Sequence, residues 1–401
     1  MKLRRNILVG DKALWVIFFL LSGISLIAVY STIGYSAIID LHSTPLRIFF
    51  KHLVFVLGAY ACIILVSHVN YRRFSAMSVW LFVIAVGLLL VAAIVGTRWL
   101  SVGLFSFQPS ELAKLALIVF LARTIVRNRE RLDDRSTLIA MLVPVALVCG
   151  LVLPENLSTG VLIFAVCYLM LYFGGIDRRR WWRGCALLLA LAVGGFLFLY
   201  LLGDKIDMFR STTWNHRLHA WFNPDPDELT QENMARMAVA RGGLFFRNGI
   251  GTTIHGRLMT QAHNDFIFAI IIEEAGALVG AFIFLLYAWF YFRCMRIASR
   301  CRGLFGSLCV AGLGTSIFLQ ALLNMAVGVG ALPVTGQTLP FISYGGTSYI
   351  VSAIGIGVIQ AVAADNRRGA LSADPQLRTI HNSQFHNSQI TNHSSQNTQS
   401  I

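Results

Sequence analysis

The sequence predicts an all-α polytopic membrane protein with about ten transmembrane helices. Of its 401 residues, 56% are hydrophobic and only 13% are charged, whereas a soluble domain usually carries about 25% charged residues. Apolar runs of roughly 20 residues, long enough to cross a bilayer, recur as far as about residue 365. We therefore expect one membrane-embedded domain, residues 1–365, rather than several soluble domains.

Ten segments of the chain are apolar enough to be membrane-crossing helices. The fourth to sixth are short or interrupted, so their ends are the hardest to place. The predicted spans are residues 13–32, 48–68, 76–96, 110–126, 137–153, 159–175, 184–203, 265–291, 304–329 and 346–365.

Basic residues mark one side of the membrane. Clusters of arginine lie at both ends of the domain and in the connectors after the second, fourth, sixth and eighth spans, while the other short connectors hold only Arg47, Lys51 and Arg98. Connectors rich in lysine and arginine stay in the cytoplasm, which places both termini there and requires an even number of spans. The net charge of +14 therefore indicates topology signals and contact with anionic membrane lipids, not a nucleic-acid partner.

Two segments depart from the pattern of spans and short connectors. Residues 204–264 form a long external loop between the seventh and eighth spans, in which Gln231–Phe246 has the apolar spacing of an interfacial helix. Residues 366–401 are polar and repeat His-Asn-Ser-Gln, so we expect a disordered cytoplasmic tail.

Two opposite charges lie inside the fourth span. Glu111 and Lys114 are three residues apart and share one helix face. Charged residues are unfavourable in a membrane, so they are either paired for structural reasons or functional. The sequence leaves both open: a structural ion pair, or a pair that faces substrate at the outer end of the helix.

Other polar residues fall on the same outer side, where they predict a water-accessible site walled by helices. Asp265 can alternatively be an N-cap of the eighth helix, and Glu273 and Glu274 can be buried structural acids. The outer polar candidates are Arg98, Glu155, Asn156, His263, Asn264, Asp265, Thr335 and Ser343.

Three motifs resemble the SEDS family (shape, elongation, division and sporulation proteins). They are Arg98-Trp99 leading into Phe107-Gln-Pro-Ser-Glu-Leu-Ala-Lys114, then Ala262-His-Asn-Asp-Phe-Ile-Phe-Ala269, and Leu332-Pro-Val-Thr-Gly-Gln-Thr-Leu-Pro-Phe-Ile-Ser-Tyr-Gly-Gly346. They occur in family order, and the resemblance extends to about residue 365. One departure is Asn156, which stands where the family usually has an acid.

The resemblance implies an inverting peptidoglycan glycosyltransferase of the inner (cytoplasmic) membrane. Its substrate would be lipid II, a disaccharide-pentapeptide on undecaprenyl diphosphate. Asp265 matches the family's essential aspartate and would be the catalytic base or a ligand for Mg²⁺ or Mn²⁺. The residues expected to bind substrate are Arg98, Glu111, Lys114, His263, Thr335 and Ser343.

The resemblance also indicates a role in the cell. Gly336-Gln-Thr-Leu-Pro-Phe resembles the division type (FtsW) more than the elongation type (RodA), because Thr precedes Leu-Pro. Either type implies a class B penicillin-binding protein as transpeptidase partner, and the division type implies other division proteins. The alternatives are an elongation polymerase, a flippase or transporter of the same lipid, and a non-catalytic scaffold.

Overall fold

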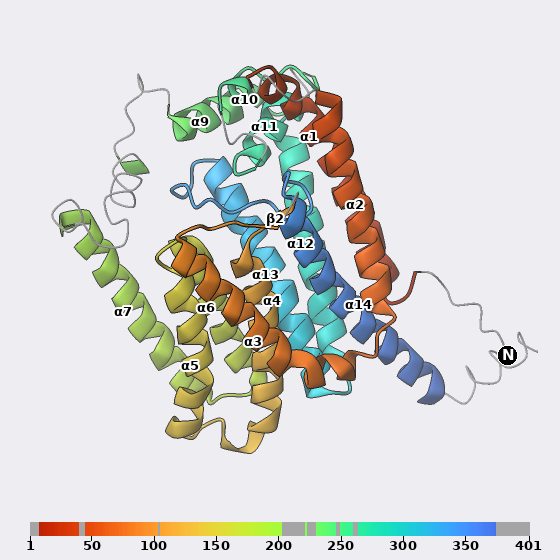
Figure 1. The fold of residues 1–401 in the computed structure, drawn as a ribbon, viewed down its shortest axis with the longest axis vertical. Coiled ribbons are helices and arrows are strands. Elements are labelled where there is room, and N and C mark those ends of the chain that lie inside the picture. The colour runs from red at the N-terminus through yellow and green to blue at the C-terminus, as the bar shows by residue number, and fades with distance from the viewer. Residues whose placement is uncertain are drawn as a thin grey trace, which may run out of the picture.

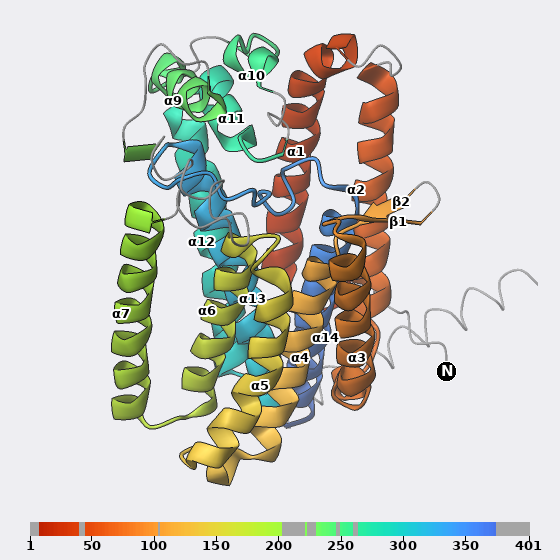
Figure 2. The ribbon, with the colours of Figure 1, turned by 60° about the vertical axis from the view of Figure 1, so that its left-hand side comes forward.

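The structure, a computed structural model, describes residues 8–39, 45–102, 105–202, 221–222, 230–245, 249–259 and 264–373. Long helices run side by side through the molecule, and short helices cover one end of them (Figures 1 and 2). The predicted all-α polytopic fold is confirmed.

Eight helices of the described residues are long and apolar enough to cross a membrane. Two more run alongside them: α4 (Pro109–Arg127), which has four charged residues, and α7 (Arg178–Leu202), which has four arginines among its first six residues. The eight are α1 (Lys12–Ile39), α2 (Pro45–Ser67), α3 (Tyr71–Val95), α5 (Arg135–Val152), α6 (Leu157–Gly174), α12 (Ala277–Ser299), α13 (Leu304–Gly328) and α14 (Gly346–Ala373).

The predicted eighth span, residues 265–291, is wrong because the chain breaks at Gly276. The short helix α11 (Ile267–Ala275) ends there, and the crossing helix α12 begins at Ala277. Gly276 has φ +88°, and a Cβ on it would lie 2.7 Å from the carbonyl carbon of Phe245. Because only glycine accepts both conditions readily, this one residue divides a continuous apolar run into two helices.

A short antiparallel pair of strands interrupts the otherwise helical fold. β1 (Leu100–Val102) pairs with β2 (Phe105–Phe107) directly before α4, in a stretch where the sequence predicted only a connector. The hydroxyl of Thr347 in α14 donates to the carbonyl of Ser106 at 3.0 Å. The strands thus tie the entry to α4 to the start of α14.

The end covered by short helices contains α9 (Gln231–Gly242), α10 (His255–Leu258) and α11. α9 confirms a helix within 231–246, and its Met234 and Ala238 pack with Phe266 and Ile270 in a small separate core. The rest of the long loop falls partly outside the described residues. The predicted tail does so from residue 374, while α14 continues through 366–373.

α13 and α14 form the centre of the bundle. In their most apolar 18-residue windows, 72% and 78% of the residues are buried, against 22% in α2 and α3. α13 packs on α4, α6 and α12, and α14 packs on α2, whereas α7 lies at the edge in both views (Figures 1 and 2). Polar residues on α13 are therefore enclosed by protein.

We expect Gly242→Ala to lower the melting temperature of the detergent-solubilised protein. A Cβ on Gly242 would lie 2.0 Å from the carbonyl oxygen of Ile272, so α9 must move away from α11; overpacking of this kind costs about 1–3 kcal/mol. Gly87→Ala in α3 is the matched control, because nothing lies within 4 Å of a Cβ there. Equal melting temperatures for the two variants would contradict this contact.

Candidate functional site

The segment between α13 and α14, residues 329–345, runs across the bundle on the side of the α9–α11 helices (Figure 2). One buried amide of α13 holds it in place. Nδ2 of Asn324 donates to the carbonyl of Gln337 at 2.7 Å and to the carbonyl of Asp265 at 2.9 Å. A single side chain therefore fixes this segment against the residues that precede α11.

The same segment is bonded to the start of α6. Nε2 of Gln337 donates to Oγ1 of Thr159 at 2.5 Å. Asn156 caps α6, because its side chain accepts from the backbone N–H of Thr159 at 3.2 Å. Asn156, where the family usually has an acid, thus orders the turn that presents Thr159.

Ser343 makes a further link to the approach to α11. Its hydroxyl donates to the carbonyl of Asn264 at 2.6 Å and accepts from the backbone N–H of Leu339 at 2.8 Å. Ser343 is buried. Its hydroxyl therefore joins two backbone segments.

A carboxylate and a guanidinium meet at Gly336. A Cβ on this residue would lie 3.8 Å from Oδ2 of Asp265 and 4.0 Å from Nη2 of Arg98. Both charged residues are partly exposed. Asp265 is not an N-cap, because α11 begins at Ile267 with Phe266 at the cap position. The structure thus brings a negatively charged and a positively charged side chain from distant parts of the chain to one partly exposed place beside Gly336.

Thr335 precedes Gly336 directly and carries a hydroxyl group. Oγ1 of Thr335 is buried and has no hydrogen-bond partner among the described residues, and the same is true of Oδ1 of Asn324. Buried polar atoms of this kind usually bind water or a ligand. The surroundings of Asp265 therefore retain hydrogen-bonding capacity.

Glu111 and Lys114 form a buried pair that reaches the same segment. Oε2 of Glu111 lies 2.8 Å from Nζ of Lys114, which also donates to Oε1 of Gln320 at 2.6 Å. Nε2 of Gln320 donates to the carbonyl of Thr338 at 3.3 Å. Glu111 and Lys114 are only 4% and 7% exposed, and this burial favours the structural reading of the pair.

Glu273 and Glu274 are buried acids that hold the α9–α11 region together. Glu273 pairs with Arg241 at 3.0 Å and with Nδ1 of His255 at 2.8 Å, and it accepts from the hydroxyl of Thr253. Oε1 of Glu274 accepts from the backbone N–H of Gly251 at 3.1 Å. Both acids have protein partners, in agreement with the structural reading of the sequence.

The balance between burial and hydrogen bonding gives the two acids opposite pKa shifts. Burial alone would raise the pKa of Glu273, but hydrogen bonds from Thr253 and His255 outweigh burial and lower it. Burial raises the pKa of Glu274 above its ordinary value, and its hydrogen bonds, including one from Ser31, offset only part of this effect. The lowered pKa of Glu273 agrees with its contacts to Arg241 of α9 and His255 of α10.

The structure thus divides the sequence-predicted residues into three sets. The first set lies around Gly336 and consists of Arg98, Asp265 and Thr335. The second is the pair Glu111 and Lys114, which reaches residues 336–338 through Gln320. The third is His263, which lies outside the described residues. The sequence interpretation missed the amides Gln320, Asn324 and Gln337. Gln320 and Asn324 are polar residues one helical turn apart in an apolar span, which is the signal that could have identified them.

Gly336 has a backbone conformation that disfavours β-branched side chains. Its φ of +66° disfavours branched residues, while Asn adopts this region more readily. We expect Gly336→Val to lower activity strongly, because it strains the backbone by about 1–2 kcal/mol and places a branched side chain beside Asp265 and Arg98. Gly336→Asn should retain more activity. The measurements are catalytic activity and thermal melting, and equal activity of the two variants would contradict the role of this conformation.

The chain is similar to proteins of one family over most of its length. The profile of the FtsW/RodA/SpoVE family, described as a cell cycle protein, matches residues 11–368. A probable peptidoglycan glycosyltransferase FtsW from Haemophilus influenzae is 30% identical over 377 residues, which cover 90% of this chain and 92% of that one. Stage V sporulation protein E from Bacillus subtilis is 30% identical over 376 residues, covering 89% and 98%.

Two solved structures share the fold. One is a chain from a peptidoglycan synthase complex that coordinates polymerization and crosslinking, with a TM-score of 0.70, 22% identity, and coverage of 89% of this chain and 98% of that one. The other is the rod shape determining protein RodA from Thermus thermophilus, with a TM-score of 0.63, 22% identity, and coverage of 89% and 97%. By its sequence match over residues 11–368, the chain belongs to the FtsW/RodA/SpoVE family of cell cycle proteins.

Proposed function

We propose that the protein is a peptidoglycan glycosyltransferase of the FtsW type, which polymerises lipid II at the outer face of the inner membrane. The observation that carries the proposal is the meeting of Asp265 and Arg98 at Gly336. Relatives named peptidoglycan glycosyltransferase support the reaction class. A carboxylate beside a guanidinium supplies the two functions that the transfer needs: a proton acceptor and a positive charge.

The reaction is an inverting displacement at the anomeric carbon of the lipid-linked strand. A hydroxyl of the acceptor sugar forms the new glycosidic bond, while the bond from the anomeric carbon to the carrier diphosphate breaks. In our proposal Oδ2 of Asp265 takes the proton of the attacking hydroxyl. Arg98 lies within reach of the same place and stabilises the negative charge on the departing diphosphate.

A divalent cation is compatible with these residues. The described residues contain no group of three or more His, Cys, Asp or Glu that could hold a metal. Mg²⁺, however, often binds through one or two carboxylates together with substrate phosphates and water. Asp265 would be that carboxylate, and Mg²⁺ or Mn²⁺ would supply positive charge at the diphosphate.

The buried polar network positions these groups. Lys114 is paired with Glu111 and enclosed, so in our proposal it orients residues 336–338 through Gln320 and does not contact the diphosphate itself. Asn324 fixes the backbone of Asp265 in the same way. Thr335 is the remaining candidate for direct contact with the sugar, because its hydroxyl has no partner among the described residues.

We also propose a division role and a transpeptidase partner. Several relatives are named FtsW, and one chain of similar fold comes from a complex that coordinates polymerization and crosslinking. A class B penicillin-binding protein would supply crosslinking here. An elongation polymerase of the RodA type is the alternative, and the identity of the transpeptidase that co-purifies with the chain distinguishes the two.

The proposed orientation can be tested separately from the chemistry. We expect residues 204–264 to face outward and residues 127–135 and 366–401 to face the cytoplasm, because the arginine clusters mark the latter side. Single-cysteine variants in these segments, treated with a membrane-impermeant reagent, provide the measurement. Labelling of a cysteine at position 131 from outside intact cells would reverse the orientation.

The decisive test of function is the purified chain incubated with lipid II, with and without its transpeptidase partner. We expect glycan strands to form and to depend on Asp265. If lipid II instead crosses the membrane of a sealed vesicle without polymerising, the chain is a transporter of this lipid. If neither process occurs with the partner present, a scaffold role replaces the enzymatic one.

A further inference from the structure

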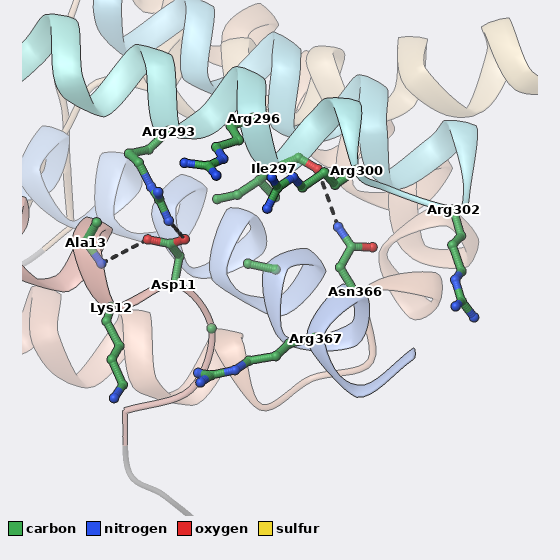
Figure 3. Close-up of a pocket in the computed structure, with 12 residues that line it drawn as sticks. Asp11, Lys12, Ala13, Arg293, Arg296, Ile297, Arg300, Arg302, Asn366 and Arg367 are labelled. Carbon is green, nitrogen blue, oxygen red and sulfur yellow. Dashed lines mark hydrogen bonds and ion pairs between the residues drawn. The ribbon is translucent and has the colours of Figure 1, made fainter. Parts of the chain in front are cut away.

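A cavity lies at the end of the bundle opposite the short helices α9–α11 (Figure 2). It has a volume of about 520 Å³, and its walls come from residues 10–13 at the start of α1, residues 293–302 at the end of α12, and residues 363–367 in α14 (Figure 3). These segments are far apart in the sequence. Small-ligand pockets in proteins measure about 300–1,000 Å³, so the cavity is large enough for a small polar group.

The lining of this cavity is strongly basic. Six cationic side chains line it together with a single carboxylate, that of Asp11. Asp11 is already engaged, because Arg293 donates to it and its Oδ1 accepts from the backbone N–H of Ala13 at 2.9 Å. The cations are Lys12, Arg293, Arg296, Arg300, Arg302 and Arg367.

Several of these cations have no anionic partner of their own. The ion pairs among the described residues include Arg293 but not Arg296, Arg300 or Arg367. Arg296 extends from α12 and Arg367 from α14, on opposite sides of the cavity (Figure 3). Nε of Arg293 is buried and also has no hydrogen-bond partner among the described residues. Several unneutralised cations thus surround one space.

Hydrogen bonds between the helices hold the walls of the cavity in place. Gln360 of α14 accepts from the backbone N–H of Asp11 at 2.7 Å and donates to its carbonyl at 3.1 Å. Asn366 donates to the carbonyl of Ile297 at 3.4 Å. Gly10 has φ +95°, and a Cβ there would lie 2.3 Å from Oε1 of Gln360. A topology signal needs arginines only in the connector, whereas this arrangement is a fixed basic pocket.

We propose that this pocket binds the phosphate group of an anionic ligand. The planar guanidinium group suits phosphate oxygens because it donates two parallel hydrogen bonds. Basic pockets between transmembrane helices on the cytoplasmic side are typical sites for phospholipid headgroups. The phosphate comes either from such a headgroup or from a soluble phosphate ester, and in both cases it joins the ends of α1, α12 and α14.

The test is a binding measurement on the full chain in detergent. The probes are short-chain phosphatidylglycerol, phosphatidylcholine of the same chain length, and glycerol 3-phosphate. We expect saturable binding of phosphatidylglycerol that is tighter than that of phosphatidylcholine and weakens with salt. If glycerol 3-phosphate binds as tightly, the natural source is a soluble ester; if it does not, the source is the lipid. Both results support a phosphate site.

Two double variants distinguish phosphate binding in the pocket from attraction by exposed surface charge. Arg296→Gln/Arg300→Gln removes two cations from the pocket and should weaken phosphate binding about tenfold or more. Arg129→Gln/Arg131→Gln removes two exposed cations between α4 and α5 on the same end of the bundle, outside the pocket, and should bind like the parent. Equal losses in both, or no saturable binding by the parent, would overturn the proposal. The readout does not depend on polymerisation, so it stands apart from the proposed enzymatic function.

Discussion

Asp265→Asn will reduce lipid II polymerisation by about 10²–10⁴-fold if the carboxylate is a general base, and it will leave the melting temperature nearly unchanged. The amide has almost the same size as the carboxylate but cannot accept the proton. The backbone carbonyl of Asp265, which accepts from Asn324 at 2.9 Å, is not altered by the substitution. Glycan-strand formation and thermal melting are the two measurements.

The matched control for this experiment is Glu232→Gln. Glu232 lies in the first turn of α9, on the same end of the molecule, and the substitution removes the same charge. We expect it to polymerise at a rate close to that of the parent. An Asp265→Asn variant that melts normally and still polymerises lipid II at the parent's rate would remove this carboxylate from the mechanism.

Lys114→Met will destabilise the protein by about 3–5 kcal/mol, because it leaves a buried carboxylate without its partner. Glu111 is 4% exposed, and its oxygen lies 2.8 Å from the lysine nitrogen. Oε1 of Gln320 loses a hydrogen bond at the same time. Activity should fall together with stability, since Gln320 also holds the carbonyl of Thr338. Thermal melting and polymerisation are measured side by side.

The double variant Glu111→Gln/Lys114→Met distinguishes a positioning pair from a substrate contact. Removing both charges avoids the uncompensated carboxylate, so we expect most of the lost stability to return. If the pair only positions residues 336–338, measurable polymerisation returns with it. A double variant that melts like the parent but remains inactive would mean that Lys114 contacts the substrate.

The membrane-crossing helices were predictable because hydrophobic length dictates them. The exception is the eighth span. The residues on both sides of Gly276 are apolar, so the sequence predicted one helix where the structure has two. The break depends on the close approach of Phe245, which is a tertiary contact. The strands at 100–107 were missed for a different reason: with three residues each, they are too short to show a pattern of alternation.

The charged residues of the candidate site could be predicted from the sequence, but the residues that hold them in position could not. Arg98 and Asp265 are charges at the outer ends of apolar spans, which made them candidates, and the family resemblance assigned Asp265 its catalytic role. Asn324 acts by bridging the carbonyls of Asp265 and Gln337, and such a bridge exists only after the chain has folded. The partnership of Glu273 with Arg241 and His255 likewise depends on how α9 and α10 pack on α11.

The attachment of Asp265 through Asn324 bears on how the protein responds to bilayers of different thickness. Helices adapt to a thicker or thinner membrane by tilting, and the lipid-facing ones feel this force most. α2 and α3 have only 22% of their apolar windows buried, whereas α13, which carries Asn324, has 72%. The backbone of Asp265 is therefore held by a helix that is largely shielded from lipid. The depth of the Asp265 carboxylate in the membrane and its distance from Gly336 should therefore stay constant, while the outer helices of the bundle adjust to the surrounding lipid.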